Sequence, residues 1–452
     1  MELLETLSGL LWGTPMLVAL LGCGLWLSLR TSFLPLRRLP WWLKKTLFTR
    51  RRRDKRDETA DSLSPFQALT TALASTIGTG NIVGVAAALT AGGPGALFWM
   101  WASALLGMST KYAEIVLTIH FRRRDSRGQW MGGPMIYLEQ LPGPRVLPRL
   151  FALFCLLSSL CMGNLSQTSA LAESLWTAFS LPPWICVLLC AALLGAIFLG
   201  GVRRLGSVTA FLVPIMSAAY LLAGAFLLLL HADRIPDALG QIFAGAFDLT
   251  SVGGGMAGYG ISRAMRVGLA RGVFSNEAGL GSSSLAHSAA RTNSAVEQGF
   301  WGIVEIFVDT ILICTMTGLV ILTSGLPLAD YGSRAAALTI AAFAQGFGPA
   351  AGTLLSVAIT LFALSTLIGW SYYGQQCMHY LCGPGHVRSY QAIFLLTILL
   401  GAGIRSESVW LLSDLCNGLM AVPNLIGVIA LSGTVARLTH ARFPTKKRRP
   451  GR

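Results

Sequence analysis

The residues best placed to do chemistry lie inside an apolar stretch, Thr70 to Thr90 (TTALASTIGTGNIVGVAAALT). The stretch is uncharged and can cross a bilayer core of about 30 Å, which takes about 20 helical residues. Gly78-Thr79-Gly80-Asn81 interrupts its centre, because glycine costs roughly 1 kcal/mol in a helix interior and Asn81 can bond its own backbone. Such a break is tolerated at membrane depth only where the freed backbone groups face protein, a water-filled cavity or a ligand. The break predicts a binding site, whereas a GxG pair alone also suits close helix packing.

A second apolar stretch, Ile261 to Ala290 (ISRAMRVGLARGVFSNEAGLGSSSLAHSAA), contains charged residues and several glycines. Because charges inside a span are costly, it can hardly form one continuous apolar helix. We expect the opened turn at Gly272 to Asn276, with Phe274 able to cover a substrate. Glu277 is expected to cap the half-helix that follows, near its positive end.

Two broken helices would offer opposed charged ends to a ligand. The N-terminus of a half-helix presents unpaired N–H groups, and the C-terminus presents carbonyl groups of opposite sign. N–H groups around Thr79 to Asn81 would receive a carboxylate, while carbonyls near Ala74 to Ile77 would face a cation or an ammonium group. The pattern therefore suits a zwitterion. Hydroxyl oxygens that suit a hard monovalent cation come from Ser75, Thr76, Thr79, Ser365 and Thr366.

The elements that position these residues are membrane helices. Hydrophobic residues form 53% of the 452 residues, charged residues form 12%, and the mean hydropathy is +0.61, which predicts an all-α polytopic membrane protein. The net charge of +15 lies in the loops between apolar runs, so it indicates topology and not nucleic-acid binding. The nine cysteines show no metal-ligand spacing, and neither a Walker loop nor a cluster of catalytic side chains is present, which argues against an ATPase or another enzyme.

The apolar runs predict about eleven membrane-spanning helices. Basic loops after the first and third spans and a basic tail place the amino terminus outside and the carboxyl terminus in the cytoplasm. Span two is Thr70 to Thr90 and span seven is Ile261 to Ala290; the long segment between span six and span seven is expected to include a re-entrant or surface helix. The other spans are Met1 to Leu29, Ala96 to Phe121, Leu147 to Trp176, Pro183 to Gly200, Leu205 to His231, Val296 to Thr323, Ala350 to His379, Ser389 to Gly403 and Val409 to Leu438.

Apart from the extra first span, ten spans divide into two sets of five, each beginning with its broken helix in opposite orientation. This is the inverted-repeat pattern of secondary transporters, in which paired broken helices hold substrate and ion near the midplane. The expected organisation is an amino-terminal helix and basic loop (1–64), a first repeat with a long outer segment (65–260), a second repeat (261–438) and a basic tail (439–452).

Charged residues within the spans need partners. Lys111 and Glu114 lie three apart on one helix face and are expected to pair. Glu305 and Asp309 also share a face, so one of them could be protonated or linked to an ion. Asp309 is the candidate for a second cation or proton site.

Several ordered motifs closely resemble the alanine or glycine:cation symporter family: GTGNIVGVAAALTAGGPG, GGPMIYLE, GLARGVFSNEAGLGSSS, GWSYYG and DLCNGLMAVPNL. The resemblance spans residues 65–435 and implies a LeuT-like fold with an extra first helix, and sodium- or proton-coupled uptake of small neutral amino acids. It implies that substrate contacts come from Thr76, Gly78, Thr79, Gly80, Asn81, Gln167, Phe274, Asn276, Thr366 and Trp370. Sodium would be held by Ala74, Ile77, Ser365 and Thr366, and a second cation by Thr76 and Asn81; Asp309 joins this second cation or proton site on the charge argument above.

The chain departs from the family pattern at Gln375, where glutamate is common, which puts any inner-gate salt bridge at that position in doubt. The combined interpretation is an inner-membrane symporter that imports alanine or glycine with sodium, works as a monomer and needs no cofactor. Proton coupling, specificity for glutamine or D-alanine, and an ion channel remain the alternatives.

Overall fold

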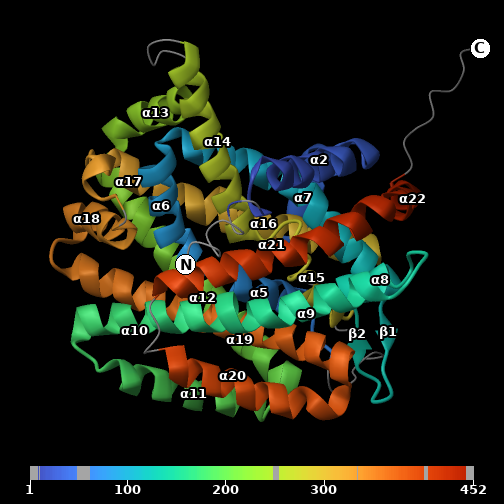
Figure 1. The fold of residues 1–452 in the computed structure, drawn as a ribbon. Helices are drawn as coiled ribbons and strands as arrows, with labels where there is room; N and C mark the ends of the chain where they lie inside the picture. The colour runs from blue at the N-terminus through green and yellow to red at the C-terminus, as the bar shows by residue number, and fades with distance from the viewer. Residues whose placement is uncertain are drawn as a thin grey trace, which may run out of the picture.

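The computed structural model describes residues 9, 11–47, 62–247, 254–332, 334–401 and 406–443. The chain is built from helices, and its one described sheet is a two-stranded hairpin of β1 (Arg123–Arg124) and β2 (Trp130–Met131). The long helices α9 (Val146–Leu160), α10 (Ser166–Phe179), α19 (Ala350–Cys382) and α21 (Ser406–Ala430) run alongside one another across the molecule (Figure 1).

The remaining elements follow the predicted order of the spans. Before the first broken helix lie α2 (Thr14–Arg30), α3 (Leu34–Arg37) and α4 (Leu39–Leu47). The first half contains α5 (Pro65–Thr76), η2 (Thr79–Asn81), α6 (Val83–Gly92), α7 (Gly95–Phe121), α8 (Pro134–Leu138), η3 (Cys161–Leu165), α11 (Pro183–Phe198) and α12 (Gly201–Leu230). After η4 (Ala232–Arg234) and α13 (Ile235–Phe247), the second half contains α14 (Gly254–Asn276), α15 (Ser284–Ser288), α16 (Ala295–Ile306), η5 (Phe307–Cys314), α17 (Thr315–Thr323), η6 (Leu328–Asp330), α18 (Ala335–Phe347), η7 (Pro384–His386), α20 (Val387–Gly401) and α22 (Ser432–Arg442).

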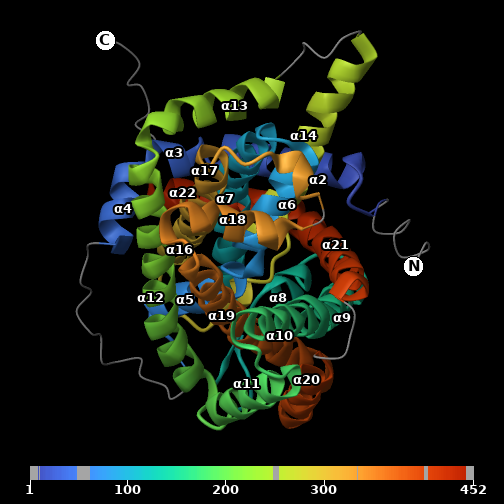
Figure 2. The same cartoon turned by 90° about the vertical axis from the view of Figure 1, so that its left-hand side faces the viewer.

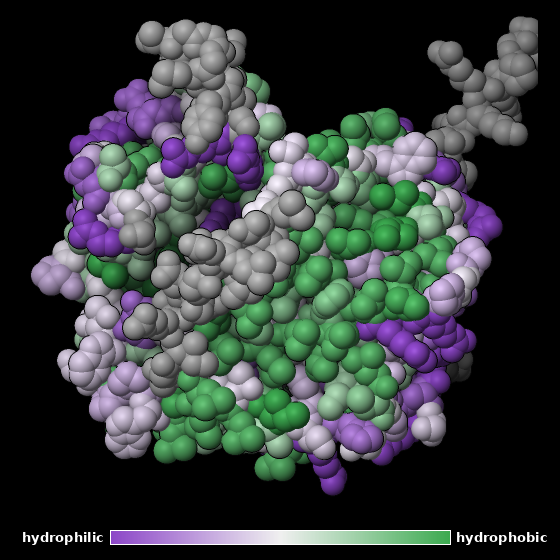
Figure 3. Space-filling model, viewed as in Figure 1, coloured by the Kyte–Doolittle hydropathy of each residue, from purple (hydrophilic) through white to green (hydrophobic). Residues whose placement is uncertain are grey.

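The molecular surface is that of a membrane protein. A broad band of hydrophobic residues occupies the middle of the face shown in Figure 3, and hydrophilic residues gather toward its left and right edges. Large apolar side chains stand exposed along several helices, among them Leu199 (90% exposed), Leu229 (78%) and Phe211 (72%). Contiguous apolar surface on this scale is stable only against lipid or another protein. The prediction of a multi-pass helical membrane protein is confirmed, whereas the number of eleven crossings stays a prediction.

The first broken helix forms where the sequence predicts it. α5 begins with a capping box, in which Ser64 and Gln67 satisfy each other's backbone N–H groups. It ends at Thr76 because Ile77 and Gly78 take extended backbone conformations. A single 3₁₀ turn, η2, then leads into α6.

The second broken helix opens later than predicted. The expectation of an opened turn at Gly272 to Asn276 is wrong, because α14 continues through Asn276 and the break spans residues 277–283. Gly272 serves close packing instead, since a Cβ there would collide with the Ser103 hydroxyl of α7. The chain leaves the helix at Glu277, whose φ is +55°, and two glycines with positive φ follow at 279 and 281.

The two broken helices run in opposite directions and pair half with half. α6 packs against α14, and α5 packs against α15, while α7 lies against both α14 and α16. The halves after the first break and before the second therefore share one side of the membrane. This arrangement is the inverted repeat that the spacing of the two breaks predicts.

Three elements differ from the predicted spans or add to them. The surface helix expected between spans six and seven is present as α13, which lies along the upper edge of the molecule in both ribbon views (Figures 1 and 2) and contacts α7 through Phe98 and Phe243. α18 was not predicted and packs on α6 and α19. The last predicted span is divided at Leu431 into α21 and α22.

Candidate functional site

The first break exposes backbone groups of both signs. The Gly78 N–H, which would continue the α5 helix by bonding the Ala74 carbonyl, donates instead to Asn81 Oδ1 at 3.0 Å. The N–H groups of Thr79 and Gly80 have no hydrogen-bond partner within the described ranges. The break therefore leaves donors at the start of η2 and an acceptor, the Ala74 carbonyl, at the end of α5.

A set of oxygens converges on the end of α5 from α19. The Ser365 hydroxyl lies 3.4 Å from the Ile77 carbonyl oxygen, and the Thr366 hydroxyl lies 3.5 Å from the same atom. Ser365 is fully buried and Thr366 is 1% exposed. Hard cations bind oxygens at about 2.3–2.6 Å, so two ligands roughly at right angles lie about 3.3–3.7 Å apart. The two distances to the Ile77 carbonyl oxygen are in the range expected for ligands of a shared hard cation.

Close packing holds α19 in this position. Gly369 lies against the backbone of Ser75, where a Cβ would come within 2.7 Å of the Ser75 nitrogen. One turn further along α19, the Tyr373 hydroxyl meets the Ser75 hydroxyl at 2.5 Å. The end of α5 and the middle of α19 therefore form one rigid unit.

The space beside Gly78 is small and polar. A Cβ at Gly78 would lie 2.7 Å from the Thr366 hydroxyl and 3.6 Å from Gln167 Oε1. Thr79 Oγ1 donates to the same Gln167 oxygen at 3.3 Å. Gln167 follows η3, a π-helical turn at residues 161–165, and π turns inside α-helices often mark functional sites. The structure thus brings Gly78, Thr79, Gln167 and Thr366 together, as predicted.

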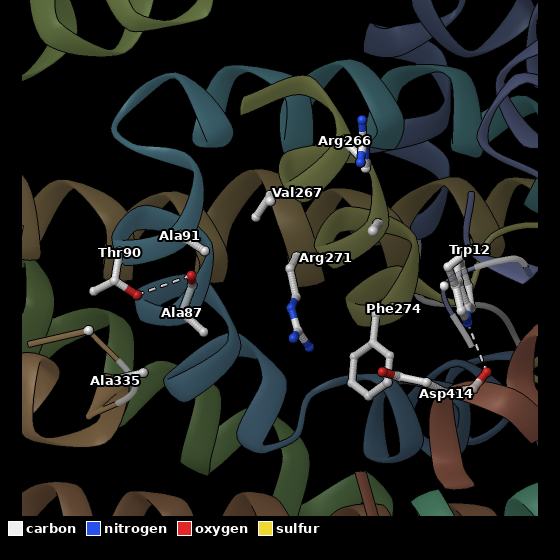
Figure 4. Close-up of a pocket in the computed structure, with 13 residues that line it drawn as sticks. Trp12, Ala87, Thr90, Ala91, Arg266, Val267, Arg271, Phe274, Ala335 and Asp414 are labelled. Atoms are coloured by element: carbon white, nitrogen blue, oxygen red, sulfur yellow. Dashed lines mark hydrogen bonds between the residues drawn. The ribbon is translucent and has the colours of Figure 1, made fainter. Parts of the chain in front are cut away.

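Phe274 contacts both the first break and a cavity. A Cβ at Gly80 would lie 3.8 Å from the Phe274 ring. The ring also lines a cavity of about 440 Å³ between α6, α14 and α21, whose other lining residues include Thr90, Arg271 and Asp414. In Figure 4 the Arg271 side chain points into this cavity, and its guanidinium carbon lies 5.8 Å from the centre of the Phe274 ring. Phe274 therefore stands between the cavity and the broken turn.

Asn81 and Asp309 form a second polar centre. Asn81 Nδ2 donates to Asp309 Oδ1 at 2.7 Å, and the other carboxylate oxygen accepts from Ser275 and Thr310, each at 2.8 Å. All four side chains are at most 3% exposed. Asp309 lies in η5, a second π turn. The Thr76 hydroxyl instead bonds carbonyls of its own helix, at 3.3 and 3.5 Å, so the structure does not join it to this centre.

Two further predicted residues have different surroundings. Asn276 is fully buried and shapes the second break, because its Oδ1 accepts from the Ala278 N–H at 3.0 Å. Trp370 is also fully buried and packs against Gly163 of η3. Its indole nitrogen has no hydrogen-bond partner among the residues described. An unpaired donor on a predicted substrate residue is consistent with a ligand contact.

The charged residues on α7 pair differently from the prediction. Lys111 does not pair with Glu114: its ammonium group lies 2.6 Å from the Ser283 hydroxyl and 3.3 Å from Glu305 Oε1. Glu114 accepts from the Gly279 N–H at 3.0 Å and from Asn424 at 2.7 Å. Residues three apart on a helix share a face, but the second break inserts partners for each of them.

Two smaller expectations concern single side chains. Glu277 does not cap the second half-helix, because it ends α14 and accepts from the Ser282 hydroxyl within the break. Gln375 accepts from Gln391 at 3.0 Å, so a neutral amide pair occupies the position where the sequence left an inner-gate salt bridge in doubt.

On the side predicted to be cytoplasmic, hydrogen bonds join the segments next to α5 and α15, the two inner half-helices. The Leu63 N–H donates to the Ala289 carbonyl at 2.9 Å, and the Arg291 N–H donates to the Leu63 carbonyl at 2.7 Å. The Arg122 guanidinium donates to three carbonyls at or beyond the C-terminal residue of α15, those of Ser288, Ala290 and Thr292, at 2.7–2.8 Å. These bonds join the segment before α5, the end of α7 and the segment after α15.

Comparison with known proteins identifies the family of the chain. The model of the sodium:alanine symporter family matches residues 1–450. The chain belongs to this family. The sodium/alanine symporter AgcS of Methanococcus maripaludis is 42% identical over 97% of this chain and 96% of its own length, and the amino-acid carrier protein AlsT of Bacillus subtilis is 32% identical over 96% and 90%. Among solved structures, the nucleobase-cation-symport-1 transporter Mhp1 superposes with a TM-score of 0.52 at 16% identity, covering 86% of this chain and 95% of its own.

This family member is a transporter and not an enzyme, and its fold is of the LeuT-like type. Sequence reasoning missed Ser275 and Thr310, which surround Asp309, and both π turns. A π turn has no reliable sequence signature, because it depends on how the neighbouring helices pack. Asn417, a buried residue of α21 whose Nδ2 contacts the Met162 sulfur of η3, was missed for the same reason.

Proposed function

We propose that this symporter imports a small neutral amino acid, alanine or glycine, together with sodium. The proposal rests on one observation: two N–H groups without a partner among the described residues, on Thr79 and Gly80, lie next to an oxygen set made by Ile77, Ser365 and Thr366. The N–H groups can receive a substrate carboxylate, and the oxygen set suits sodium. The relatives named as a sodium/alanine symporter and an amino-acid carrier support the same assignment.

In this proposal sodium binds between the Ala74 and Ile77 carbonyls and the two α19 hydroxyls. The bound ion reinforces the positive end of η2, which favours a carboxylate beside it. Thr366 contributes to both ligands, so each ligand stabilises the arrangement that the other needs. This shared residue is a physical basis for coupling. Asn81 and Asp309 are the candidates for a second cation.

The size of the substrate is limited by the groups around Gly78. The Thr366 hydroxyl, Gln167 and Phe274 all approach the broken turn closely, which leaves room for a methyl group more readily than for a glutamine side chain. We propose that Phe274 covers the substrate from the cavity in Figure 4. With the cytoplasmic side tied by Leu63 and Arg122, the proposed state is one that faces outward.

Uptake into proteoliposomes tests the proposal. Labelled alanine, glycine, glutamine and D-alanine are offered under an imposed sodium gradient, a proton gradient, or neither. Sodium-driven accumulation of alanine or glycine is the expected result. Preferred uptake of glutamine or D-alanine would replace the proposed substrate, and uptake driven by a proton gradient alone would replace sodium as the proposed coupling ion. Flux that ignores both gradients would indicate a channel.

Two variants test the site. Asn81→Ala and Thr366→Ala should each lower sodium-dependent uptake by at least about tenfold, since losing a buried ligand worth about 1.4 kcal/mol has that effect. Thr360→Ala is the matched control, because the one partner of the Thr360 hydroxyl in the described part of the chain is the Ser356 carbonyl of its own helix, at 2.7 Å. Near-normal uptake by both site variants, at equal amounts of folded protein, would remove the site from this position.

A further inference from the structure

The second break encloses more negative than positive charge. Glu114, Glu277 and Glu305 are all fully buried around it, and Lys111 is the one lysine or arginine among the described residues that touches these carboxylates. If all three glutamates were ionised, the balance against Lys111 would be two negative charges. A protonated His287, whose Nε2 lies 3.4 Å from Glu305 Oε2, would offset only one of them. Buried charge without compensation is strongly disfavoured, so at least one carboxyl group must carry a proton.

The donors around each carboxyl group favour one of the three as the holder of that proton. Glu305 contacts both Lys111 and His287, which stabilises its charged form. Glu114 accepts two N–H donors at Oε1, from the Gly279 backbone and the Asn424 amide, while its Oε2 has no hydrogen-bond partner among the described residues. Glu277 receives one hydroxyl contact, from Ser282, and its Oε1 is buried with no partner in the part of the chain that the structure describes.

The backbone position of Glu277 points the same way. Its N–H donates to the Val273 carbonyl at 2.8 Å, so Glu277 closes the last turn of α14. A negative charge at a helix C-terminus faces the negative end of the helix dipole and is destabilised there. The residue also takes the left-handed conformation, with φ at +55°, which fixes it in the mouth of the break.

The other ionisable groups near Glu277 do not reverse this argument. They come from six elements: Lys111 and Glu114 of α7, His287 of α15, Glu305 of α16, Asp309 of η5, Tyr373 of α19 and Cys155 of α9. Lys111 is the one lysine or arginine in this set, and its ammonium group contacts Ser283 and Glu305. The buried acidic groups oppose a charge on Glu277. A metal ion is a poor alternative, because the described residues contain no group of three or more His, Cys, Asp or Glu side chains that could hold one, and one hydroxyl contacts this carboxylate.

We propose that Glu277 is a proton-binding site, separate from the proposed sodium site, and that it holds its proton while the two inner half-helices are tied together. The proton neutralises the Glu277 carboxylate as long as the second break is shut off from water. When the Leu63 and Arg122 contacts open, water reaches the break and the Glu277 carboxyl can pass its proton to it. The inference does not rest on the proposed substrate or coupling ion.

Infrared spectroscopy of the full-length protein in lipid tests this site without a transport assay. The wild type at neutral pH should show the C=O stretching band of a protonated carboxyl group. Biosynthetic ¹³C labelling of glutamate should shift the band, which separates it from Asp309. Glu277→Gln should abolish the band, and Glu114→Gln, which alters another buried carboxylate of the same break, should retain it.

Three outcomes would overturn the proposal: no such band in the wild type, a band that glutamate labelling leaves in place, or a band that persists in Glu277→Gln. Loss of the band in Glu114→Gln, with retention in Glu277→Gln, would move the proton to the neighbouring carboxyl group. The labelling experiment uses the unaltered sequence, so the proposal stays testable even if Glu277→Gln does not fold.

Discussion

Replacing Gly78 with alanine adds one methyl group at the centre of the proposed site. Gly78 has φ −133° and ψ −161°, an extended conformation that alanine adopts without strain. The new Cβ would lie 2.7 Å from the Thr366 hydroxyl, whereas ordinary contacts begin at 3.4 Å. The hydroxyl, or the broken turn itself, must therefore move by about 0.7 Å, the difference between these two distances.

The size of the effect follows from the packing. Added methyl groups in close-packed interiors typically cost about 1–3 kcal/mol. Thr366 lies on an unbroken helix anchored through Gly369 and Tyr373, so it cannot move away freely. If this cost falls on the state that binds sodium, then at 1.4 kcal/mol per factor of ten the half-saturating sodium concentration should rise roughly 5- to 150-fold.

The assay is alanine uptake into proteoliposomes across a range of external sodium concentrations. Gly84→Ala on α6 is the matched control, because nothing lies within 4 Å of a Cβ there, and its sodium dependence should be that of the wild type. Serine at position 366 lacks the methyl group that restricts rotation of the hydroxyl. The double variant Gly78→Ala, Thr366→Ser should therefore recover part of the lost sodium affinity. An unchanged half-saturating concentration in Gly78→Ala would refute the placement of sodium beside Ile77.

Three further predictions concern the supports of the site. Lys111→Met leaves Glu305 buried without its ammonium partner and should cost about 3–5 kcal/mol of stability, seen as a lower melting temperature in detergent. The double variant Lys111→Met, Glu305→Leu should recover most of the lost stability. A single variant as stable as the wild type would contradict the ion pair. Arg122→Ala removes three charge-assisted bonds, worth about 1.5–3 kcal/mol each, and should increase cytoplasmic labelling of a cysteine at Ala290. Arg124→Ala, exposed and stacked on Trp130, should leave labelling unchanged; equal labelling in both variants would exclude Arg122 as a closing contact. Gly163→Ala would place a Cβ against Trp370 and should lower alanine uptake. Gly195→Ala should not lower uptake, because the nearest atom to a Cβ there lies 3.8 Å away. Normal uptake in both variants would mean that Trp370 is not held in place by η3.

The sequence determined the class of fold and the position of the first break. Hydropathy and the loop charges are local properties, so they can be read without knowing which helices meet. The GTGN turn is also locally encoded, because two glycines and an asparagine disfavour a helix wherever they stand. The family motifs then placed Gln167 and Thr366 with this turn, and the structure brings these residues together.

Only the tertiary structure decided the second break and the partners of the buried charges. Gly272 looks like a helix breaker in sequence, but α7 packs against it, and that packing keeps α14 wound until Glu277. Lys111 and Glu114 share a helix face, yet Ser283 and Gly279 come between them from a segment far along the chain. A helix ends where the sum of local preference and packing changes sign, and packing energy depends on neighbours that a linear pattern does not contain.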